Sequence, residues 1–385
     1  MKGKIFNETS DLYISEEELL ALAGEAGTDV LYQIVLTAMS KVKRYRRIVV
    51  AISGGSDSDI LMDLFCLLDP RGERVRFVYV NPGLEYKATI EHIHFLEKRY
   101  GRMVTIIRPK ETIPYCCKTY GQPFCNKNVS EYLYRLQMHG FDFAKHGALS
   151  FEKLMELYPD TKSALEFWCD KKGEKSMFSI RQNKCLKEFI LKYPPYFRIS
   201  RMCCVKAKEA PMDDYLDETS SDLSVCGVRR SEGGVRAGSY KNCFTAALEG
   251  ADEYRPLFLM KNEDKRIYEE IRSVVHSSCY KEYGLVRTGC CCCPFGRNFE
   301  KELAAAQKHE PSLYRAALTV FKDSITYTKM YECYKSTLSV SDELVAEFEQ
   351  NRETYEERTQ PTFRQLSILD VIDDIENLKG GSTCR

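Results

Sequence analysis

The amino-acid sequence predicts an α/β protein in which helices flank a parallel sheet, with a helical insertion and a mostly helical C-terminal region. Short apolar, β-branched runs alternate with segments of helical spacing, as in strand–helix–strand units with right-handed crossovers. A Gly- and Ser-rich turn separates the first run from the first helix. The runs occupy residues 47–52, 75–80 and 103–107, and the helical segments occupy residues 60–68 and 86–100.

The other elements follow in chain order. Residues 1–46 are expected to be an N-terminal helical segment, because Ser15 precedes three glutamates that suit a helix start. Residues 47–262 are expected to form the α/β domain, interrupted at about 111–196 by an insertion rich in Lys, Tyr, Phe and Cys. The C-terminal region, 263–385, is expected to be helical and to complete a metal site. The sheet is expected to resume at 223–228 and near 255–259.

Composition narrows the class of protein. The chain has 385 residues, of which 44% are hydrophobic and 29% charged, and this balance excludes disordered and fibrous proteins. The length suits two domains, or one domain with large insertions. Acidic and basic side chains number 56 each. A net charge of zero argues against attraction of the whole protein to nucleic acid, although a local basic patch remains open.

The zero net charge hides an uneven distribution. Residues 41–47 contain five basic side chains in seven, whereas residues 342–376 contain 11 acidic and three basic ones. We interpret the basic run as a solvated helix face, with contact to a nucleic acid as the alternative.

Eight of the 17 cysteines gather at 116–117, 203–204 and 290–293. The first residues, MKGKIFNETSDLY, lack the apolar segment of a secretory signal, and no run of 18 apolar residues predicts a membrane span. A cytoplasmic protein without a membrane partner is therefore expected, in which thiols stay reduced. Clustered cysteines in such a protein favour metal binding or catalysis over disulfides.

A turn with the chemistry of a phosphate site joins the first predicted strand to the first predicted helix. It consists of Ser53, Gly54, Gly55, Ser56, Asp57 and Ser58. Strand–turn–helix placement presents backbone N–H groups and a helix N-terminus to an anion, and the glycines permit close approach. The serine hydroxyls can donate, and Asp57 is expected to cap the helix or help hold Mg²⁺. Ordinary turn chemistry is the alternative.

This turn resembles the SGGxDS signature of the PP-loop ATP pyrophosphatases, an adenine nucleotide alpha hydrolase-like fold, and matches it at every fixed position. Members of that superfamily split ATP between its α- and β-phosphates and transfer AMP to an acceptor. The resemblance implies that the loop cradles the pyrophosphate of Mg²⁺–ATP.

Two further segments resemble the phosphoadenosine phosphosulfate reductase branch of that superfamily. Asn-Pro-Gly-Leu-Glu-Tyr at 81–86 is similar to its D/N-T-G-L-E-F/Y element, with Pro82 in place of Thr. Gly-Val-Arg-Arg-Ser-Glu at 227–232 is similar to an element with paired arginines. Such arginines suit bidentate contact with phosphate or sulfate, with a surface ion pair as the alternative. The resemblance implies nucleotide binding by Asn81, Gly83, Glu85 and Arg236, and catalytic roles for Asp57, Arg229 and Arg230.

The tandem pair at 203–204 and the Cys-x-x-Cys at 290–293 supply four thiols, a set that suits Zn²⁺ or an iron–sulfur cluster. The arrangement resembles the cluster motif of the assimilatory adenosine 5′-phosphosulfate reductases. It implies a [4Fe–4S] cluster, with zinc as the alternative. The implied ligands are Cys203, Cys204, Cys290 and Cys293, and the intervening Cys291 and Cys292 are interpreted as packed small hydrophobes.

The remaining candidate thiols are less defined. Cys116, Cys117 and Cys125 are interpreted as free cysteines, with sulfur relay or additional ligation as alternatives. The reductases carry a catalytic cysteine near the C-terminus in a Glu-Cys-Gly-[LI]-His element, which is absent around Cys384.

Two chemistries occur in the branch that the sequence resembles. The intact SGGxDS loop suits a nucleotide with β- and γ-phosphates, and so favours an ATP-dependent enzyme that adenylates an acceptor for sulfur transfer. Its implied partners are an adenine nucleotide and a sulfur donor, and a nucleic acid is one acceptor left open. The tandem cysteines favour the alternative, a sulfonucleotide reductase that releases sulfite with a thioredoxin-type reductant. A non-catalytic nucleotide and cluster sensor is a third hypothesis.

Overall fold

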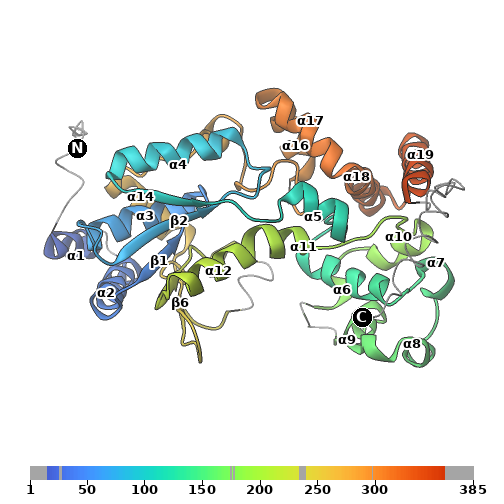
Figure 1. Ribbon diagram of the computed structural model, residues 1–385, viewed down its shortest axis with the longest axis horizontal. Helices are drawn as coiled ribbons and strands as arrows, with labels where there is room; N and C mark the ends of the chain where they lie inside the picture. The colour runs from blue at the N-terminus through green and yellow to red at the C-terminus, as the bar shows by residue number, and fades with distance from the viewer. Residues whose placement is uncertain are drawn as a thin grey trace, which may run out of the picture.

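A single six-stranded sheet forms the centre of the α/β part (Figure 1). The computed structural model describes residues 15–359 except 26–27, 174–175, 177, 234–239 and 297. The strand order is β3-β2-β1-β4-β6-β5; every neighbouring pair is parallel except β5 and β6. The predicted α/β class with a mostly parallel sheet is therefore confirmed. The strands are β1 (Ile48–Ala51), β2 (Val75–Val80), β3 (Val104–Ile107), β4 (Leu223–Val225), β5 (Phe244–Thr245) and β6 (Asp252–Tyr254).

The strand order brings the two predicted phosphate elements together. From β1 the chain proceeds outward to β2 and β3, and then returns to place β4 on the other side of β1. Open α/β sheets bind ligands beyond the carboxyl ends of the strands at such a reversal. The Ser53–Ser58 loop follows β1 and the paired arginines follow β4, so both lie at this point of the sheet.

The last parallel strand is shifted from the sequence expectation. The sequence predicts a strand near 255–259, but β6 ends at Tyr254. Pro256 has no N–H to donate to a strand ladder. The chain turns there instead, and the Phe258 N–H donates to the Arg255 carbonyl at 3.1 Å.

Helix α3 (Ser56–Leu68) runs through the interior of the α/β core, and every residue from 57 to 68 is buried. Its Asp63 side chain is fully buried and accepts four hydrogen bonds. The Tyr100 and Tyr268 hydroxyls donate at 3.2 and 2.7 Å, and the Arg272 guanidinium donates at 3.0 and 3.1 Å. A carboxylate inside a protein needs such partners. Around α3 lie α2 (Asp29–Arg44), α4 (Lys87–Tyr100) and α14 (Asn262–Arg272), and α1 (Glu16–Glu25) packs on α2.

The helices of the insertion and the C-terminal helices share a second core, which is rich in aromatic side chains. The ring centre of Phe124 lies 4.7 Å from that of Tyr327, and the ring centre of Phe189 lies 5.2 Å from that of Tyr331. In Figure 1 these helices form the right-hand part of the molecule. They are α6 (Lys127–Met138), α7 (Phe143–His146), α8 (Phe151–Leu157), α9 (Lys162–Trp168), α10 (Leu186–Lys192), α18 (Lys322–Thr337) and α19 (Asp342–Thr359).

A third core lies between the α/β part and the aromatic core, and it contains most of the clustered cysteines. A continuous helical stretch crosses it, with a π-helical turn at Val205–Glu209 between α11 and α12. Turns of this kind are frequent at functional sites. The helices of this region are α5 (Ile113–Tyr120), α11 (Met202–Cys204), α12 (Ala210–Glu218), α15 (Ser278–Lys281), α16 (Phe299–His309) and α17 (Pro311–Val320).

The basic segment 41–47 contributes contacts between the end of α2 and the sheet. The Lys41 ammonium lies 3.3 Å from the ring centre of Phe244, and the backbone N–H groups of Arg46 and Arg47 donate to the Asp222 carboxylate at 3.1 and 2.9 Å. Part of this segment is therefore committed to internal contacts. Among the described helices, none is both long and apolar enough to cross a membrane.

Candidate functional site

The Ser53–Ser58 loop has the backbone shape that its sequence predicts. Gly54 has a φ of +67°, and a Cβ at this position would lie 2.6 Å from the Thr89 Cγ2 atom. A side chain is therefore excluded on both conformational and steric grounds. The Ser58 hydroxyl donates to the Gly55 carbonyl at 2.7 Å, so the last serine of the loop closes it onto the first turn of α3.

Asp57 makes ion pairs with two cations. Its Oδ1 atom accepts from Arg229 Nε at 2.9 Å and from Lys265 Nζ at 2.7 Å. Burial opposes ionisation of Asp57, but a hydrogen bond from Glu232 and the charges of Lys265 and Arg229 outweigh it and lower the pKa. Burial and the neighbouring Asp57 raise the pKa of Glu232. The pKa values of the two carboxyl groups are therefore shifted in opposite directions.

The two arginines predicted to act together occupy different surroundings. Arg229 is buried, and its NH1 group donates to Ser231 Oγ and to Asn262 Oδ1, each at 2.9 Å. Arg230 is exposed, and its backbone N–H donates to the Phe258 carbonyl at 2.8 Å. The third predicted arginine, Arg236, lies outside the described residues.

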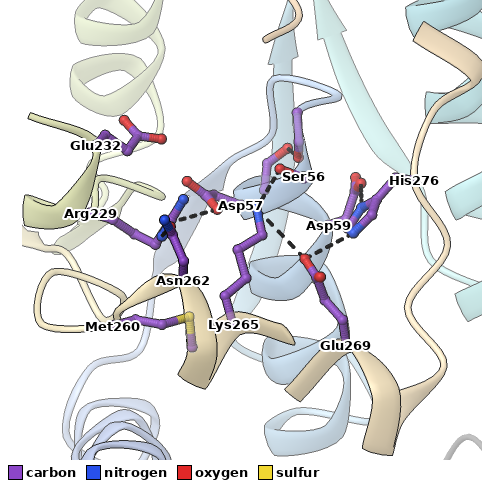
Figure 2. Close-up of polar contacts among 12 residues, drawn as sticks. Ser56, Asp57, Asp59, Arg229, Glu232, Met260, Asn262, Lys265, Glu269 and His276 are labelled. Atoms are coloured by element: carbon purple, nitrogen blue, oxygen red, sulfur yellow. Dashed lines mark hydrogen bonds and ion pairs between the residues drawn. The ribbon is translucent and has the colours of Figure 1, made fainter. Parts of the chain in front are cut away.

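Lys265 is a member of the loop site that sequence reasoning did not find. It projects from α14 to the N-terminus of α3, where it donates to Ser56 Oγ and to Asp57 (Figure 2). Only 13% of its side chain is exposed. The available signal was the helical spacing of polar residues at 262, 265, 269 and 272, which all lie on the side of α14 that faces the loop and α3.

A chain of charged groups continues from Lys265 into the core (Figure 2). Lys265 Nζ lies 3.6 Å from Glu269 Oε1, which is 2.9 Å from His276 Nε2. His276 Nδ1 lies 2.7 Å from Asp59 Oδ2, and His92 Nε2 lies 2.9 Å from Asp59 Oδ1. Burial lowers the pKa of His276, but the hydrogen bonds to Asp59 and Glu269 outweigh burial and raise it to about 9. The imidazolium of His276 therefore donates one hydrogen bond to Asp59 and one to Glu269.

The segment that precedes Cys290 contacts the Ser53–Ser58 loop through Tyr280 and Thr288. The backbone N–H of Ser56, one of the donors expected to meet an anion, donates to the Tyr280 hydroxyl at 2.9 Å. A Cβ built on Gly55 would lie 3.3 Å from the same hydroxyl and 3.2 Å from Thr288 Oγ1. Chain continuity then links the loop to Cys290, two residues beyond Thr288.

The segment after β2 reaches the cysteines. Asn81 Oδ1 accepts from the Gly83 N–H at 3.0 Å, and Gly83 has a φ of +87°, so these two residues form a turn. Glu85, predicted to bind nucleotide, accepts a hydrogen bond from Lys208 Nζ at 2.5 Å. The Cys290 thiol also donates to Glu85, at 3.7 Å.

The four predicted thiol ligands come from two backbone segments of the third core. Cys203 and Cys204 lie on α11, and the Cys293 N–H donates to the Cys290 carbonyl at 3.3 Å in a turn. Burial and the nearby Cys204 thiol raise the pKa of Cys293 to about 12. Burial likewise raises the pKa of Cys290, against the charge of Lys208. In the part of the chain that the structure describes, no three His, Cys, Asp or Glu side chains are arranged to hold a metal ion.

The other cysteines separate by location. A hydrogen bond with Cys117 is the main cause that raises the pKa of Cys203, so Cys117 lies at the tandem pair. Cys125 lies at the aromatic core of the insertion, where its thiol donates to Asn183 Oδ1 at 3.6 Å. Cys291 and Cys292 are fully buried in the third core. Cys384 lies outside the described residues.

Comparisons with known proteins agree with the sequence motifs. Residues 47–146 match the phosphoadenosine phosphosulfate reductase domain. An uncharacterized protein of Methanocaldococcus jannaschii is 29% identical over 126 residues, which are 31% of this chain and 24% of that protein. The chain thus spans about a quarter of the length of this relative.

Three solved structures align with much of the chain at low identity. The phosphoadenylyl-sulfate reductase of Candida auris, in a phosphate complex, is 11% identical and covers 75% of this chain and 98% of its own, with a TM-score of 0.36. The NH₃-dependent NAD synthetase of Campylobacter jejuni is 12% identical, with coverages of 84% and 97% and a TM-score of 0.31. The U34-tRNA thiolase NcsA of Methanococcus maripaludis, with its [4Fe–4S] cluster, is 12% identical, with coverages of 84% and 81% and a TM-score of 0.33.

The matched region contains β1, the glycine loop, α3, β2, α4 and β3. Residues 47–146 of this chain are therefore similar to the phosphoadenosine phosphosulfate reductase domain, in agreement with the motifs at 53–58 and 81–86.

Proposed function

We propose that this protein binds ATP at the Ser53–Ser58 loop and adenylates an acceptor, which then receives sulfur. The observation that carries the proposal is the meeting of the intact loop with Arg229 and Lys265 at the strand-order reversal. Backbone N–H groups, serine hydroxyls and the Lys265 ammonium, on a loop that Arg229 anchors, together match the charge of a polyphosphate. They also stabilise the pyrophosphate as it leaves.

The proposed reaction has two steps. An oxygen of the acceptor attacks the α-phosphorus of ATP, the bond from that phosphorus to the bridging oxygen breaks, and pyrophosphate departs. A sulfur nucleophile then attacks the activated carbon (thiolation) or phosphorus (phosphorothioation) of the acceptor and displaces AMP. Mg²⁺ would enter with the ATP phosphates. Asp57, the carboxylate expected to help hold it, is engaged by Arg229 and Lys265.

The donor chemistry of the thiol region fits an iron–sulfur cluster. Cys203 and Cys204 are adjacent on α11, one turn joins Cys290 to Cys293, and Lys208 pairs with Glu85 beside Cys290. We propose that these four cysteines hold a [4Fe–4S] cluster. Such a cluster would supply a site for carrying sulfur.

The test uses the full chain, reconstituted anaerobically with iron and sulfide. [α-³²P]ATP is incubated with candidate acceptors, including bulk tRNA and DNA, and AMP and pyrophosphate are measured. Substituting Ser58→Ala, which removes the bond that closes the loop, is expected to lower product formation at least ~10-fold. Ser312→Ala, at an exposed position on α17, is the matched control. Full activity of the Ser58 variant, or absence of both products with every acceptor, contradicts the proposal.

The tandem cysteines favour a second candidate, a sulfonucleotide reductase. It requires sulfite release from adenosine phosphosulfate or its 3′-phosphate in the presence of a thioredoxin-type reductant. Sulfite under those conditions, without AMP formation from ATP, would replace the first proposal with this one. Nucleotide binding without any turnover would instead support a sensor.

A further inference from the structure

Lys265 and Arg229 share Asp57, but they are held differently. The Arg229 guanidinium is fixed by Asp57, Ser231 and Asn262, and only 9% of its side chain is exposed. A planar guanidinium fixed on several sides has little freedom to turn toward a ligand. Arg229 is thus an anchor of the loop.

The Lys265 ammonium has more freedom at the same place. It stands on a flexible four-carbon stem and carries three N–H donors, of which Ser56 and Asp57 receive two. Ser56 is the first residue of α3, where the helix presents its positive end. A cation placed against the positive end of a helix is favourable only with an anion between them. Asp57 supplies that anion in the structure.

Releasing Lys265 would leave Asp57 paired. Arg229 Nε still donates to the same carboxylate at 2.9 Å. The exchange therefore creates no isolated buried charge, which would be costly. An arriving phosphate oxygen would take the place of Asp57 at the ammonium.

Groups behind Lys265 keep it at the loop. Glu269 lies 3.6 Å from the ammonium and is itself held by His276, whose other nitrogen meets Asp59 on α3. Helix α14 is thus linked to α3 beside the lysine, through Glu269 and His276 (Figure 2). A lysine tethered in this way is positioned before any ligand binds.

We propose that Lys265 is the residue that contacts the nucleotide phosphate, and that it exchanges Asp57 for a phosphate oxygen on binding. The proposal rests on nucleotide binding at the Ser53–Ser58 loop and assigns the contact to a lysine rather than to the arginines expected from the sequence. Glu269 and His276 are positioning residues, since they act on Lys265.

The test measures equilibrium binding of α,β-methylene-ATP, which cannot be cleaved between its α- and β-phosphates, and of adenosine, which has no phosphate. Lys265→Met is expected to weaken α,β-methylene-ATP binding about 10- to 100-fold, as for one charge-assisted hydrogen bond. Adenosine binding should change less than about twofold. Lys265→Arg should restore part of the affinity, because it keeps the charge.

Arg266→Met is the matched control. Arg266 is the next residue on α14, is largely exposed and pairs with Glu270 at 2.7 Å, so its loss should leave both affinities unchanged. Thermal unfolding of each variant identifies misfolded proteins, which would lose adenosine binding as well. If Lys265→Met binds α,β-methylene-ATP with wild-type affinity, the inference about Lys265 is overturned, and the proposed function is unaffected. Failure of the wild-type protein to bind α,β-methylene-ATP overturns the proposed function, and the inference with it.

Discussion

Replacing Asp63 tests how the core of the α/β part is held together. Asp63→Asn removes the negative charge that the buried Arg272 guanidinium faces at 3.0 and 3.1 Å. Breaking a buried ion pair from one side costs about 3–5 kcal/mol, because the other charge stays buried. Tyr268→Phe removes a single hydrogen bond to the same carboxylate, and should cost about 1.5–3 kcal/mol.

The assay is urea unfolding followed by far-UV circular dichroism, from which the free energy of unfolding is extrapolated. Combining Asp63→Asn with Arg272→Met removes both charges. The double variant should therefore lose at least ~1 kcal/mol less than the sum of the single losses, since contacting residues are not additive. If Asp63→Asn lowered the free energy of unfolding by less than ~1 kcal/mol, or if the two losses were strictly additive, the reasoning would be refuted. Asp63 would then not form a stabilising ion pair between α3 and α14.

Three further predictions concern the loop, the histidine and the thiols. Gly54→Ala should reduce ATP affinity at least ~10-fold in calorimetric titration, because a Cβ would lie 2.6 Å from Thr89 and the residue has positive φ; wild-type affinity would contradict this. The pKa of His276 is raised from 6.5 to about 9, so its contribution to stability, on the order of 3 kcal/mol, is complete below pH 6.5 and is lost as pH rises through 9. His276→Gln should flatten the unfolding free energy measured between pH 6.5 and 9, and an unchanged slope argues against the assignment. Cys203→Ser should lower iron and acid-labile sulfide after anaerobic reconstitution, whereas Cys291→Ser should not; equal iron in both variants would exclude Cys203 as a ligand.

Those parts of the fold and site that depend on neighbouring residues could be predicted from the sequence. The apolar run of β1, the glycines that follow it and the start of α3 are consecutive in the chain. Their structure is determined by interactions within this short segment. The same holds for the Cys-x-x-Cys turn at 290–293, where a backbone hydrogen bond closes the turn. Local periodicity and turn chemistry decide such units.

Contacts between distant segments could not be predicted in this way. Lys265 meets Asp57 across 208 positions of sequence, and the helical spacing of polar residues around Lys265 does not name this partner. The adjacent Arg229 and Arg230 look equivalent in sequence, yet one is buried and the other exposed. Glu85 belongs to a segment predicted to bind nucleotide, but its partner Lys208 is 123 positions away and brings it to the thiols. Tertiary packing alone decides these pairs.

The shared aromatic core has a consequence for synthesis of the protein. Phe124 and Phe189 emerge from the ribosome well before Tyr327 and Tyr331, whose rings complete their packing. Until α18 is made, the nascent insertion exposes a cluster of aromatic rings, and its closure must await a contact between residues far apart in the chain. Such non-local closure slows folding and favours aggregation of the intermediate. The insertion is therefore expected to expose aromatic surface while the chain is still growing.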